Sequence, residues 1–594
     1  MSHTPETSSR TDGSPTRVSP SGPAPGPVID LTHRQILVVL SGLMLGMLVA
    51  ALSQTIVATA LPTIVGELGG QDKLSWIVTA TLLTSTASTP IWGKISDLYG
   101  RKSMFQLSIV LFLIASLGSG FAQNIWWLIG FRALQGLGAG GLQALSQAIL
   151  GDVVAPRERG RYQGYMGGVF GLATVAGPLI GGFLVDHLSW RWTFWVGIPI
   201  GLAALIVTER VLRLPFRRMK HQIDWLGAFY IVAAVSSLLI VLSFGGKEFA
   251  WASTQTYLLS AATLVFLALA VFQERRAAEP IIPPHLFRNH TFVITSLGGF
   301  IVGVAMFGAT IYVPQYLQIV KLESPTASGL LTLPMMVGML GTSIASGRRI
   351  TQTGRYKRYP LIGLAIVAVG MWLLSRLHLE TSLVTMGAYI FVVGAGMGLV
   401  MQVLVLAVQN AVDRHDLGVA TSGSTFFRSM GGAVGVAVFG ALLSNRITRT
   451  IPDRFAQAGI PLPPTKGGVG SQLGTPADIR ALPGPISLAL RGGYADALQT
   501  VFLVGVPIVL VGWIVLWFLR EIPLRQASSL ARPEGPRPDA TISGGADAAN
   551  AGADGARPPE APSDGARPGV GGRGAGGTPA SVSGGVGESD QAAL

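Results

Sequence analysis

One feature repeats along almost the whole sequence: apolar stretches of about 20 residues joined by short polar connections. A helix of this length crosses the hydrocarbon core of a bilayer, and it satisfies its own backbone hydrogen bonds, as lipid requires. The predicted spanning helices are residues 36–60, 74–94, 104–122, 125–150, 162–186, 192–212, 224–245, 255–274, 291–319, 326–347, 359–377, 382–410, 418–443 and 498–519. We therefore expect an all-α, polytopic membrane protein with fourteen transmembrane helices.

The composition supports a membrane protein and excludes several other classes. Of 594 residues, 49% are hydrophobic and 12% are charged, against roughly 25% charged in a typical soluble domain. The net charge of +13 does not indicate nucleic-acid binding, because the bases gather in short loops and not on one soluble face. Cysteine is absent and the eight histidines lack ligand spacing, so no metal site and no cofactor are predicted.

The loop charges predict the orientation in the membrane. An even number of crossings places both termini on one side, and with the termini inside, most loop bases lie on the inner side, as the positive-inside rule requires. The bases of the inner loops are Lys94, Arg101, Lys102, Arg157, Arg159, Arg161, Arg210, Arg213, Arg217, Arg218, Lys220, Arg275, Arg276, Arg288, Arg348, Arg349, Arg355, Lys357, Arg358 and Arg414, and those of the short outer loops are Lys73, Arg191, Lys247, Lys321 and Arg376. We expect a multi-pass protein of the cytoplasmic membrane with both termini in the cytoplasm.

Three segments lie outside the predicted helices. Residues 1–34 are rich in Ser, Thr and Pro and lack the pattern of a cleaved signal peptide, so the first spanning helix is expected to direct insertion. Residues 521–594 are rich in Gly, Ala, Pro, Ser and Asp. Both tails are predicted to be disordered and cytoplasmic. A long outer connection, 444–497, is predicted to be loose, with a short interfacial helix over 486–490 as the alternative.

A short turn over residues 93–102, GKISDLYGRK, joins the second and third predicted helices. Gly93 and Gly100 allow a turn with positive φ and a close helix approach. Asp97 lies one helical turn before Arg101, near enough to pair with it. The bases alone are explained equally well as determinants of topology.

The fourth and fifth predicted helices carry unusual residues. Arg132 lies within a spanning helix, where a charge is costly and needs a partner or a wet cavity, so it is a functional candidate. The glycines after it fit G-x-G-x-x-G, but no strand precedes them, and they are expected to form a close-packing face. In the fifth helix, Gly177 and Pro178 predict a bend that is either static or part of a gate.

These segments resemble motifs of the major facilitator superfamily. Residues 93–102 resemble its G-x-L-x-D-x-x-G-R-K loop, with Ile95 in place of Leu, and residues 132–141 its R-x-x-Q-G-x-G fourth-helix motif, whose arginine is associated with proton coupling. Residues 171–182 resemble the G-P motif that marks exporters in that family. The resemblance, over about 33–520, implies a major facilitator fold with two six-helix bundles, at 35–213 and 281–520, and an insertion of two extra central helices at 214–280.

Further motifs resemble one branch of that family, the fourteen-helix drug:proton antiporters. They are LSQTIVATALP at 52–62, WRWTF at 190–194, DWLG at 224–227, AVQN at 407–410 and FRSMGG at 427–432. The chain departs from the branch at Ser53, where its signature has Asp, and at Gly197, where Asn is frequent. Serine cannot bind a proton near neutral pH, so the group that replaces the acid stays open.

The buried charges lead to a hypothesis about the substrate. Arg132 and Arg428 lie deep in helices, whereas Asp152, Asp186, Glu209 and Asp224 lie near helix ends, where anchoring is the favoured role. A cavity lined by the two arginines would favour neutral or anionic amphiphiles over lipophilic cations. Equally, backbone carbonyls at the glycine-rich crossings could neutralise each arginine.

The candidate residues fall into two sets. The candidates for proton coupling and gating are Asp97, Arg101, Arg132, Gly177, Pro178, Asp224 and Arg428. The candidates for the wall of a substrate cavity are polar, aromatic or sulfur-containing side chains on apolar helices: Ser53, Gln54, Gln143, Gln147, Tyr312, Gln315, Tyr316, Met397 and Gln402. Helix packing is the alternative role for each member of the second set.

The resemblance implies a secondary active transporter, not an enzyme, that exports amphiphilic drugs or toxic small molecules by proton antiport with alternating access. A phosphate loop for ATP is absent, and no catalytic acid pair or HExxH motif occurs. The alternative is a dedicated exporter of an endogenous metabolite or antibiotic, or a lipid-directed transporter with altered proton coupling. The expected partners are the substrate, protons and membrane lipid, with no nucleic acid, and the chain is expected to act as a monomer.

Overall fold

The computed structural model describes residues 33–68, 73–154, 156–212, 224–246, 249–413, 416–461 and 476–524. Within these residues the chain is helical, and its only extended pairing is an isolated bridge between Gly245 and Phe249. Nearly all of both predicted disordered tails, 1–34 and 521–594, lies outside the described residues.

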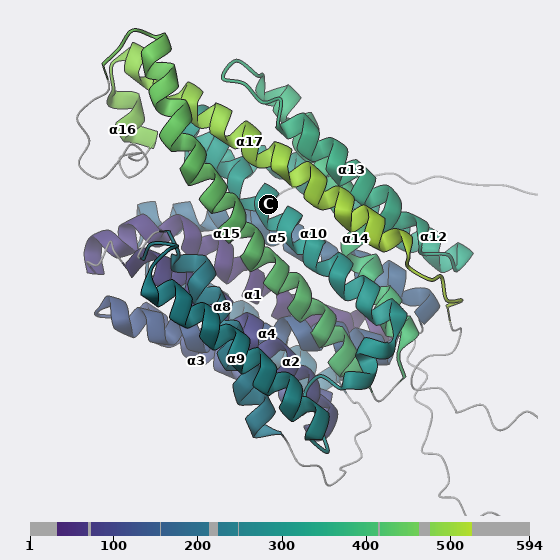
Figure 1. Ribbon diagram of the computed structural model, residues 1–594. Coiled ribbons are helices and arrows are strands. Elements are labelled where there is room, and N and C mark those ends of the chain that lie inside the picture. The colour runs from purple at the N-terminus through teal and green to yellow at the C-terminus, as the bar shows by residue number, and fades with distance from the viewer. Residues whose placement is uncertain are drawn as a thin grey trace, which may run out of the picture. The chain divides into compact units, whose positions relative to one another are not determined.

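The first half of the chain forms the helices drawn in purple to teal in Figure 1. They are α1 (His33–Leu68), α2 (Leu74–Tyr99), α3 (Arg101–Gly120), α4 (Ile125–Val153), α5 (Pro156–His187), α6 (Trp192–Trp195), α7 (Gly197–Val211), α8 (Trp225–Phe244) and α9 (Thr254–Arg276). Helices α1, α3, α4, α5 and α7 share one apolar core. The inserted pair, α8 and α9, packs together and contacts α2 and α15 through α8.

The second half forms the helices drawn in teal to yellow (Figure 1). They are η2 (Pro284–Arg288), α10 (His290–Gln315) with its π-helical continuation η3 (Tyr316–Val320), α11 (Pro325–Leu331), α12 (Leu333–Thr353), α13 (Arg358–Leu374), α14 (Leu383–Ala411), α15 (Leu417–Gln457), α16 (Pro476–Ala481) and α17 (Gly484–Trp517). Helices α10, α13, α14, α15 and α17 share a second core. The two halves of the chain meet where α5 lies along α12 and α2 lies against α15.

Every predicted spanning stretch falls on a helix, but the count of fourteen crossings is not confirmed. Eleven helices of the described residues are long and apolar enough to cross a membrane. Helix α13 is short, with 17 residues, and α2 and α4 are too polar because they bury hydroxyls, glycines and amides against each other. For example, Thr84 Oγ1 donates to the carbonyl of Ala133 at 2.7 Å.

The glycines after Arg132 form the expected close-packing face. A Cβ on Gly136 would overlap Thr81 and Thr84 of α2, and a Cβ on Gly138 would lie 2.7 Å from the backbone nitrogen of Phe112 in α3. The approach of three helices at this point depends on residues without side chains.

The prediction of a loose outer connection was wrong over most of its length. Helix α15 continues to Gln457 and α17 begins at Gly484, so residues 486–490 belong to α17 and form no separate helix. Three apolar residues four apart on α15, Ile447, Ile451 and Phe455, are buried and give this extension an apolar stripe. Residues 462–475 lie outside the described residues.

Polar contacts join the two extensions. Thr450 Oγ1 donates to the carbonyl of Gly493 at 2.7 Å, and Arg454 pairs with Asp496 at 2.7 Å. The extended part of α15 and α17 is therefore a packed helical hairpin.

Candidate functional site

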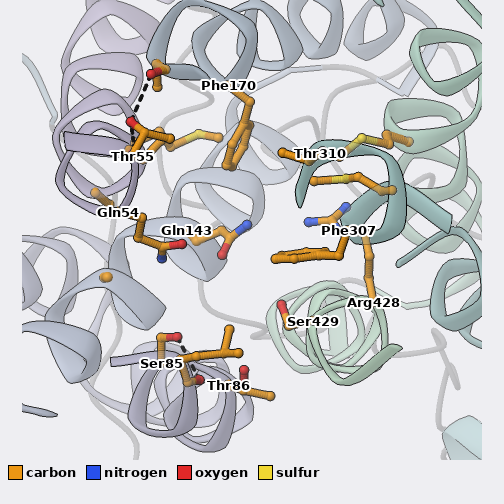
Figure 2. A pocket seen from close by; sticks show the side chains of 18 residues that line it. Gln54, Thr55, Ser85, Thr86, Gln143, Phe170, Phe307, Thr310, Arg428 and Ser429 are labelled. Carbon is orange, nitrogen blue, oxygen red and sulfur yellow. Dashed lines mark hydrogen bonds between the residues drawn. The ribbon is translucent and has the colours of Figure 1, made fainter. Parts of the chain in front are cut away.

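A cavity of about 150 Å³ lies between the two halves of the chain (Figure 2). Its wall comes from α1, α2, α4 and α5 on one side and from α10, α14 and α15 on the other. The residues labelled in the figure are Gln54, Thr55, Ser85, Thr86, Gln143, Phe170, Phe307, Thr310, Arg428 and Ser429. Both halves therefore contribute to one site.

Arg428 is the only charged residue in the cavity wall, and only 9% of its surface is exposed. Its guanidinium points into the cavity from α15 (Figure 2). Among the described residues it has no hydrogen-bond partner and no neighbouring carboxylate. The site thus carries one uncompensated positive charge.

Uncharged polar groups face this arginine. Figure 2 shows the amide of Gln143 pointing toward Arg428, with Gln54 beside it. The hydroxyl of Thr86 also lines the cavity, and it is buried without a hydrogen-bond partner among the described residues. These groups can pair with polar atoms of a ligand.

The rest of the wall is apolar and adaptable. Phe170 and Phe307 present aromatic surface (Figure 2), and Met47, Met306 and Met401 add flexible thioethers. An apolar wall with a few placed polar groups is typical of small-molecule sites, and methionine suits varied ligands.

The prediction that Arg132 shares this cavity was wrong. Arg132 is 2% exposed and lies between α2 and α4, where its Nη1 donates to Gln135 Oε1 at 2.7 Å and its Nε donates to the carbonyl of Ile77 at 3.4 Å. Gln135 in turn donates to Ser116 Oγ of α3 at 2.7 Å. As the alternative reading expected, a carbonyl and an amide compensate this arginine.

The two departures from the antiporter signature lie side by side. Ser53 and Gly197 line one small cavity of about 20 Å³, together with Ser116. The hydroxyl of Ser53 is buried without a partner among the described residues. A space of this size is large enough for about one water molecule. Ser116 therefore links this space to the hydrogen-bonded pair of Gln135 and Arg132.

Seven of the nine predicted wall residues do not line the central cavity; only Gln54 and Gln143 do. Ser53 lies one residue from Gln54, about 100° further around α1, and therefore faces a different cavity. Gln147 and Met397 are each four residues from cavity residues, Gln143 and Met401, so they lie one turn away along the same helix face.

The other predicted wall residues belong to helix contacts. Tyr312 donates to the carbonyl of Val436 at 3.2 Å, and Tyr316 to that of His378 at 2.7 Å. Gln315 accepts from Tyr494 at 3.1 Å. Met397 lies in the second apolar core, and Gln402 is buried with its Oε1 unpaired among the described residues. The alternative role, helix packing, fits them.

Sequence reasoning missed several cavity residues. Thr55, Phe170 and Ser429 lie inside or next to motifs quoted above. Their place in or beside a motif could have indicated cavity residues, whereas their residue types did not. Phe307 and Thr310 of α10 lie in no such motif. Only the packing of α10 places them in the wall.

Asp97, Arg101 and Asp152 form a buried cluster at the end of the bundle that carries the basic loops, here called the basic end. Arg101 pairs with Asp97 at 2.6 Å and with Asp152 of α4 at 2.8 Å. Burial raises the pKa of Asp97 to about 7, against the opposing effect of Arg101. A Cβ on Gly418 of α15 would overlap this cluster, so the cluster lies directly against the second half.

A second set of contacts joins the halves beside this cluster. Arg159 of α5 is buried, and it donates to the carbonyls of Val154 at 2.8 Å and Gln409 at 3.4 Å. Gln409 of α14 donates to the carbonyl of Gln147 in α4 at 2.9 Å. These bonds close the basic end between α4, α5 and α14.

The segment after α9 adds polar side-chain contacts at the same end. Lys94 of α2 pairs with Glu279 at 2.5 Å, and His285 lies 2.6 Å from Asp416, which precedes α15. The inserted helix pair is thus connected to both halves.

Two further candidates have roles in packing and capping. A Cβ on Gly177 would overlap Thr55 of α1, while α5 stays helical through Pro178. Asp224 caps α8 by accepting from the backbone nitrogen of Gly227 at 2.9 Å. Asp224 does not line the central cavity, which agrees with the anchoring role of a helix-end acid. Among the described residues, no His, Cys, Asp and Glu cluster could hold a metal ion.

Comparison with known proteins identifies the class. The model of the Major Facilitator Superfamily matches residues 43–436, so the chain belongs to this family of membrane transporters. It is therefore a multi-pass transporter of small molecules and not an enzyme.

Its relatives include proteins named for multidrug transport and multidrug resistance. The chain is 37% identical over 504 residues to the multidrug transporter protein MdtP of Bacillus subtilis, covering 82% of this chain and 93% of that one. It is 34% identical over 491 residues to multidrug resistance protein 3 of the same organism, covering 81% and 94%. It is 42% identical over 501 residues to the uncharacterized MFS-type transporter Rv1877 of Mycobacterium tuberculosis, covering 84% and 72%.

Solved structures agree with the fold. The proton:xylose symporter XylE is 12% identical, with a TM-score of 0.55, and the match covers 84% of this chain and 98% of that one. The human organic anion transporter MFSD10 is 14% identical, with a TM-score of 0.55, covering 81% and 99%. At these identities the likeness concerns the fold alone.

Proposed function

We propose that the chain is a secondary active exporter that removes amphiphilic small molecules from the cytoplasm in exchange for protons. The observation that carries this proposal is the central cavity, which has an apolar wall and a few polar groups and lies between two halves joined at the basic end. The names of the Bacillus subtilis relatives, which describe multidrug transport and multidrug resistance, support a broad range of drug-like substrates.

Alternating access follows from this arrangement. The contacts of Arg101, Arg159 and Gln409 close one end, and their release would open the cavity to that side. If the basic end faces the cytoplasm, as the loop charges predict, both termini are cytoplasmic and the closed state is the one that releases substrate outward.

Proton exchange would supply the driving force. Inward proton movement releases about 2.3 kcal/mol per 100 mV of membrane potential. Asp97 is a group suited to bind a proton near neutral pH, because burial raises its pKa to about 7. By the family resemblance, Arg132 would contribute to coupling, and the chain of Gln135 and Ser116 leads from it toward Ser53.

The test uses the full chain in sealed proteoliposomes that contain an internal pH dye. Addition of a panel of cationic, neutral and anionic amphiphiles should change the internal pH for at least one class, and Arg132→Ala should abolish the change. Transport without any proton movement would contradict proton antiport, and no transport of any compound would contradict the export proposal.

The alternative of a lipid-directed transporter has one observation in its favour. A second cavity of about 540 Å³ lies between α8, α9 and α15, with a wall that is apolar except at Glu274, Arg275 and Thr263. An acyl chain would fit such a wall. Transport of a fluorescent phospholipid between the leaflets of the same proteoliposomes, lost on Met430→Trp, would favour this alternative.

A further inference from the structure

The central cavity holds a buried charge that the protein does not neutralise. Arg428 is 9% exposed, and no acid and no hydrogen-bond partner meets its guanidinium among the described residues. A buried charge without compensation is costly, so natural proteins pair such groups or expose them to a ligand. The missing partner is therefore expected to come from the substrate.

The polar groups around Arg428 fit an anion. The amides of Gln54 and Gln143 can donate hydrogen bonds, and so can the unpaired hydroxyl of Thr86. No side chain of the wall brings a negative charge. A planar guanidinium binds a carboxylate with two parallel hydrogen bonds, which makes this pairing strong and directional.

The remaining wall defines the rest of the ligand. Phe170 and Phe307 face the cavity on either side of the polar groups (Figure 2), and methionines fill the gaps. We propose that the cavity selects amphiphilic organic anions, with the carboxylate or sulfonate at Arg428 and an apolar or aromatic body against Phe170 and Phe307. The proposal rests on the export function proposed above and names the substrate class of the same site.

A lipophilic cation would be repelled by the charge in this cavity. Its charge would lie near the guanidinium of Arg428 with no carboxylate to compensate it, and like charges at close range repel each other. A neutral ligand of the same shape would keep the apolar contacts and lose the ionic one. The expected order of affinity is anion, then neutral compound, then cation.

The experiment measures equilibrium binding to the purified full chain in detergent micelles. The probes share one aromatic body and differ in charge: naphthaleneacetate, naphthaleneacetamide and naphthylmethyl trimethylammonium. Empty micelles correct for partitioning. The wild type should bind the anion about tenfold more tightly than the cation, as a charge-assisted pair predicts.

Three variants isolate the charge. Arg428→Gln should weaken anion binding about tenfold and change binding of the neutral amide less than about twofold, because only the ionic contact is lost. Gln143→Glu should place a carboxylate opposite Arg428, weaken the anion similarly and strengthen the cation. Arg349→Gln removes a charge from an exposed position outside the cavity and should change neither. Arg428→Gln breaks no hydrogen bond within the described residues, so the variant is expected to fold.

Two results would overturn the proposal: tighter wild-type binding of the cation, or equal binding of the anion by wild type and Arg428→Gln. The failure of the export proposal looks different. If the probes bind in the expected order but do not move in proteoliposomes, the charge selection stands and transport fails. If cations are exported and anions do not bind, transport stands and the charge selection fails.

Discussion

The two halves of the molecule treat a buried arginine in opposite ways. In the first half, Arg101 pairs with two carboxylates, and Arg132 donates to an amide and a carbonyl. In the second half, Arg428 has no partner among the described residues and points into the cavity. All three are buried, so depth alone does not identify a functional charge. What separates them is whether the protein itself supplies the compensating group.

The largest loss of thermal stability is expected when Arg101, which pairs with two carboxylates, is replaced. Arg101→Gln removes the base that pairs with both Asp97 and Asp152, and removal of one partner from a buried pair costs about 3–5 kcal/mol. We expect a clear fall in the apparent Tm of the purified protein. The exposed Arg349→Gln is the matched control. A Tm equal to that of the wild type would mean that the cluster does not hold the basic end closed.

A smaller loss of stability is expected beside Arg132. Gln135→Leu removes the acceptor at 2.7 Å and also frees the hydroxyl of Ser116, which should cost about 1–3 kcal/mol. Gln143→Leu is the paired control, because Gln143 faces Arg428 and the two form no hydrogen bond within the described residues. Equal thermal stability of the two variants would mean that Gln135 does not stabilise Arg132 any more than Gln143 stabilises Arg428.

The closed basic end should respond to pH through Asp97. Its pKa is about 7 in the closed structure, raised by burial from 3.8, and it would return toward 3.8 on exposure to water. The closed state therefore binds the extra proton, so closure is favoured as pH falls from about 7 to about 4, by at most about 1.4 kcal/mol per pH unit. The charged groups that face this carboxyl are Lys94, Arg101, Asp152 and Asp416.

Spin labels can measure this response, because the chain has no cysteine to remove. Labels at Tyr99→Cys and Arg355→Cys, both exposed, would report the distance across the basic end by electron paramagnetic resonance. The population at the short distance should rise between pH 7 and pH 5, and Asp97→Asn should flatten the dependence. If the population at the short distance rose with increasing pH instead, protonation of Asp97 would not favour the closed state.

The smallest change, here in the preference for substrate charge, is expected when Ser53 is replaced. Ser53→Asp restores the acid of the antiporter signature, but Ser53 lines the small cavity with Gly197 and Ser116 and not the central one. The preference between anionic and cationic amphiphiles should therefore stay as in the wild type, whereas Gln143→Glu should invert it. A changed preference in Ser53→Asp would show that the two cavities act as one.

The sequence predicted the features that depend on residues close to one another along the chain. The helix positions followed from apolar length, and the pairing of Asp97 with Arg101 followed from their spacing of one turn. The sequence also pointed to Arg428, Gln54 and Gln143, which the structure brings to one cavity. All three are polar side chains within otherwise apolar helices.

Long-range packing decided the rest. Nothing near Asp152 in sequence predicts that it completes the Arg101 cluster, or that Gly418 lies against it. A shift of one residue rotates a side chain by about 100° around a helix, which is why Ser53 and Gln54 face different cavities. The sequence does not show that Arg132 lies outside the cavity, because its contact with the carbonyl of Ile77 depends on how α2 and α4 meet.

Helix α15 is a single helix of 41 residues, about 60 Å long at 1.5 Å per residue, with Pro452 near its far end. Its first turn lies against the Arg101 cluster, Arg428 lies about a quarter of the way along, and its far end forms the packed hairpin with α17. If α15 tilts as one body about the level of Arg428, its two ends would move in opposite directions, and the longer arm on the hairpin side would move further. A charged ligand bound at Arg428 would then act close to the level about which the helix tilts, where a small tilt displaces both ends at once.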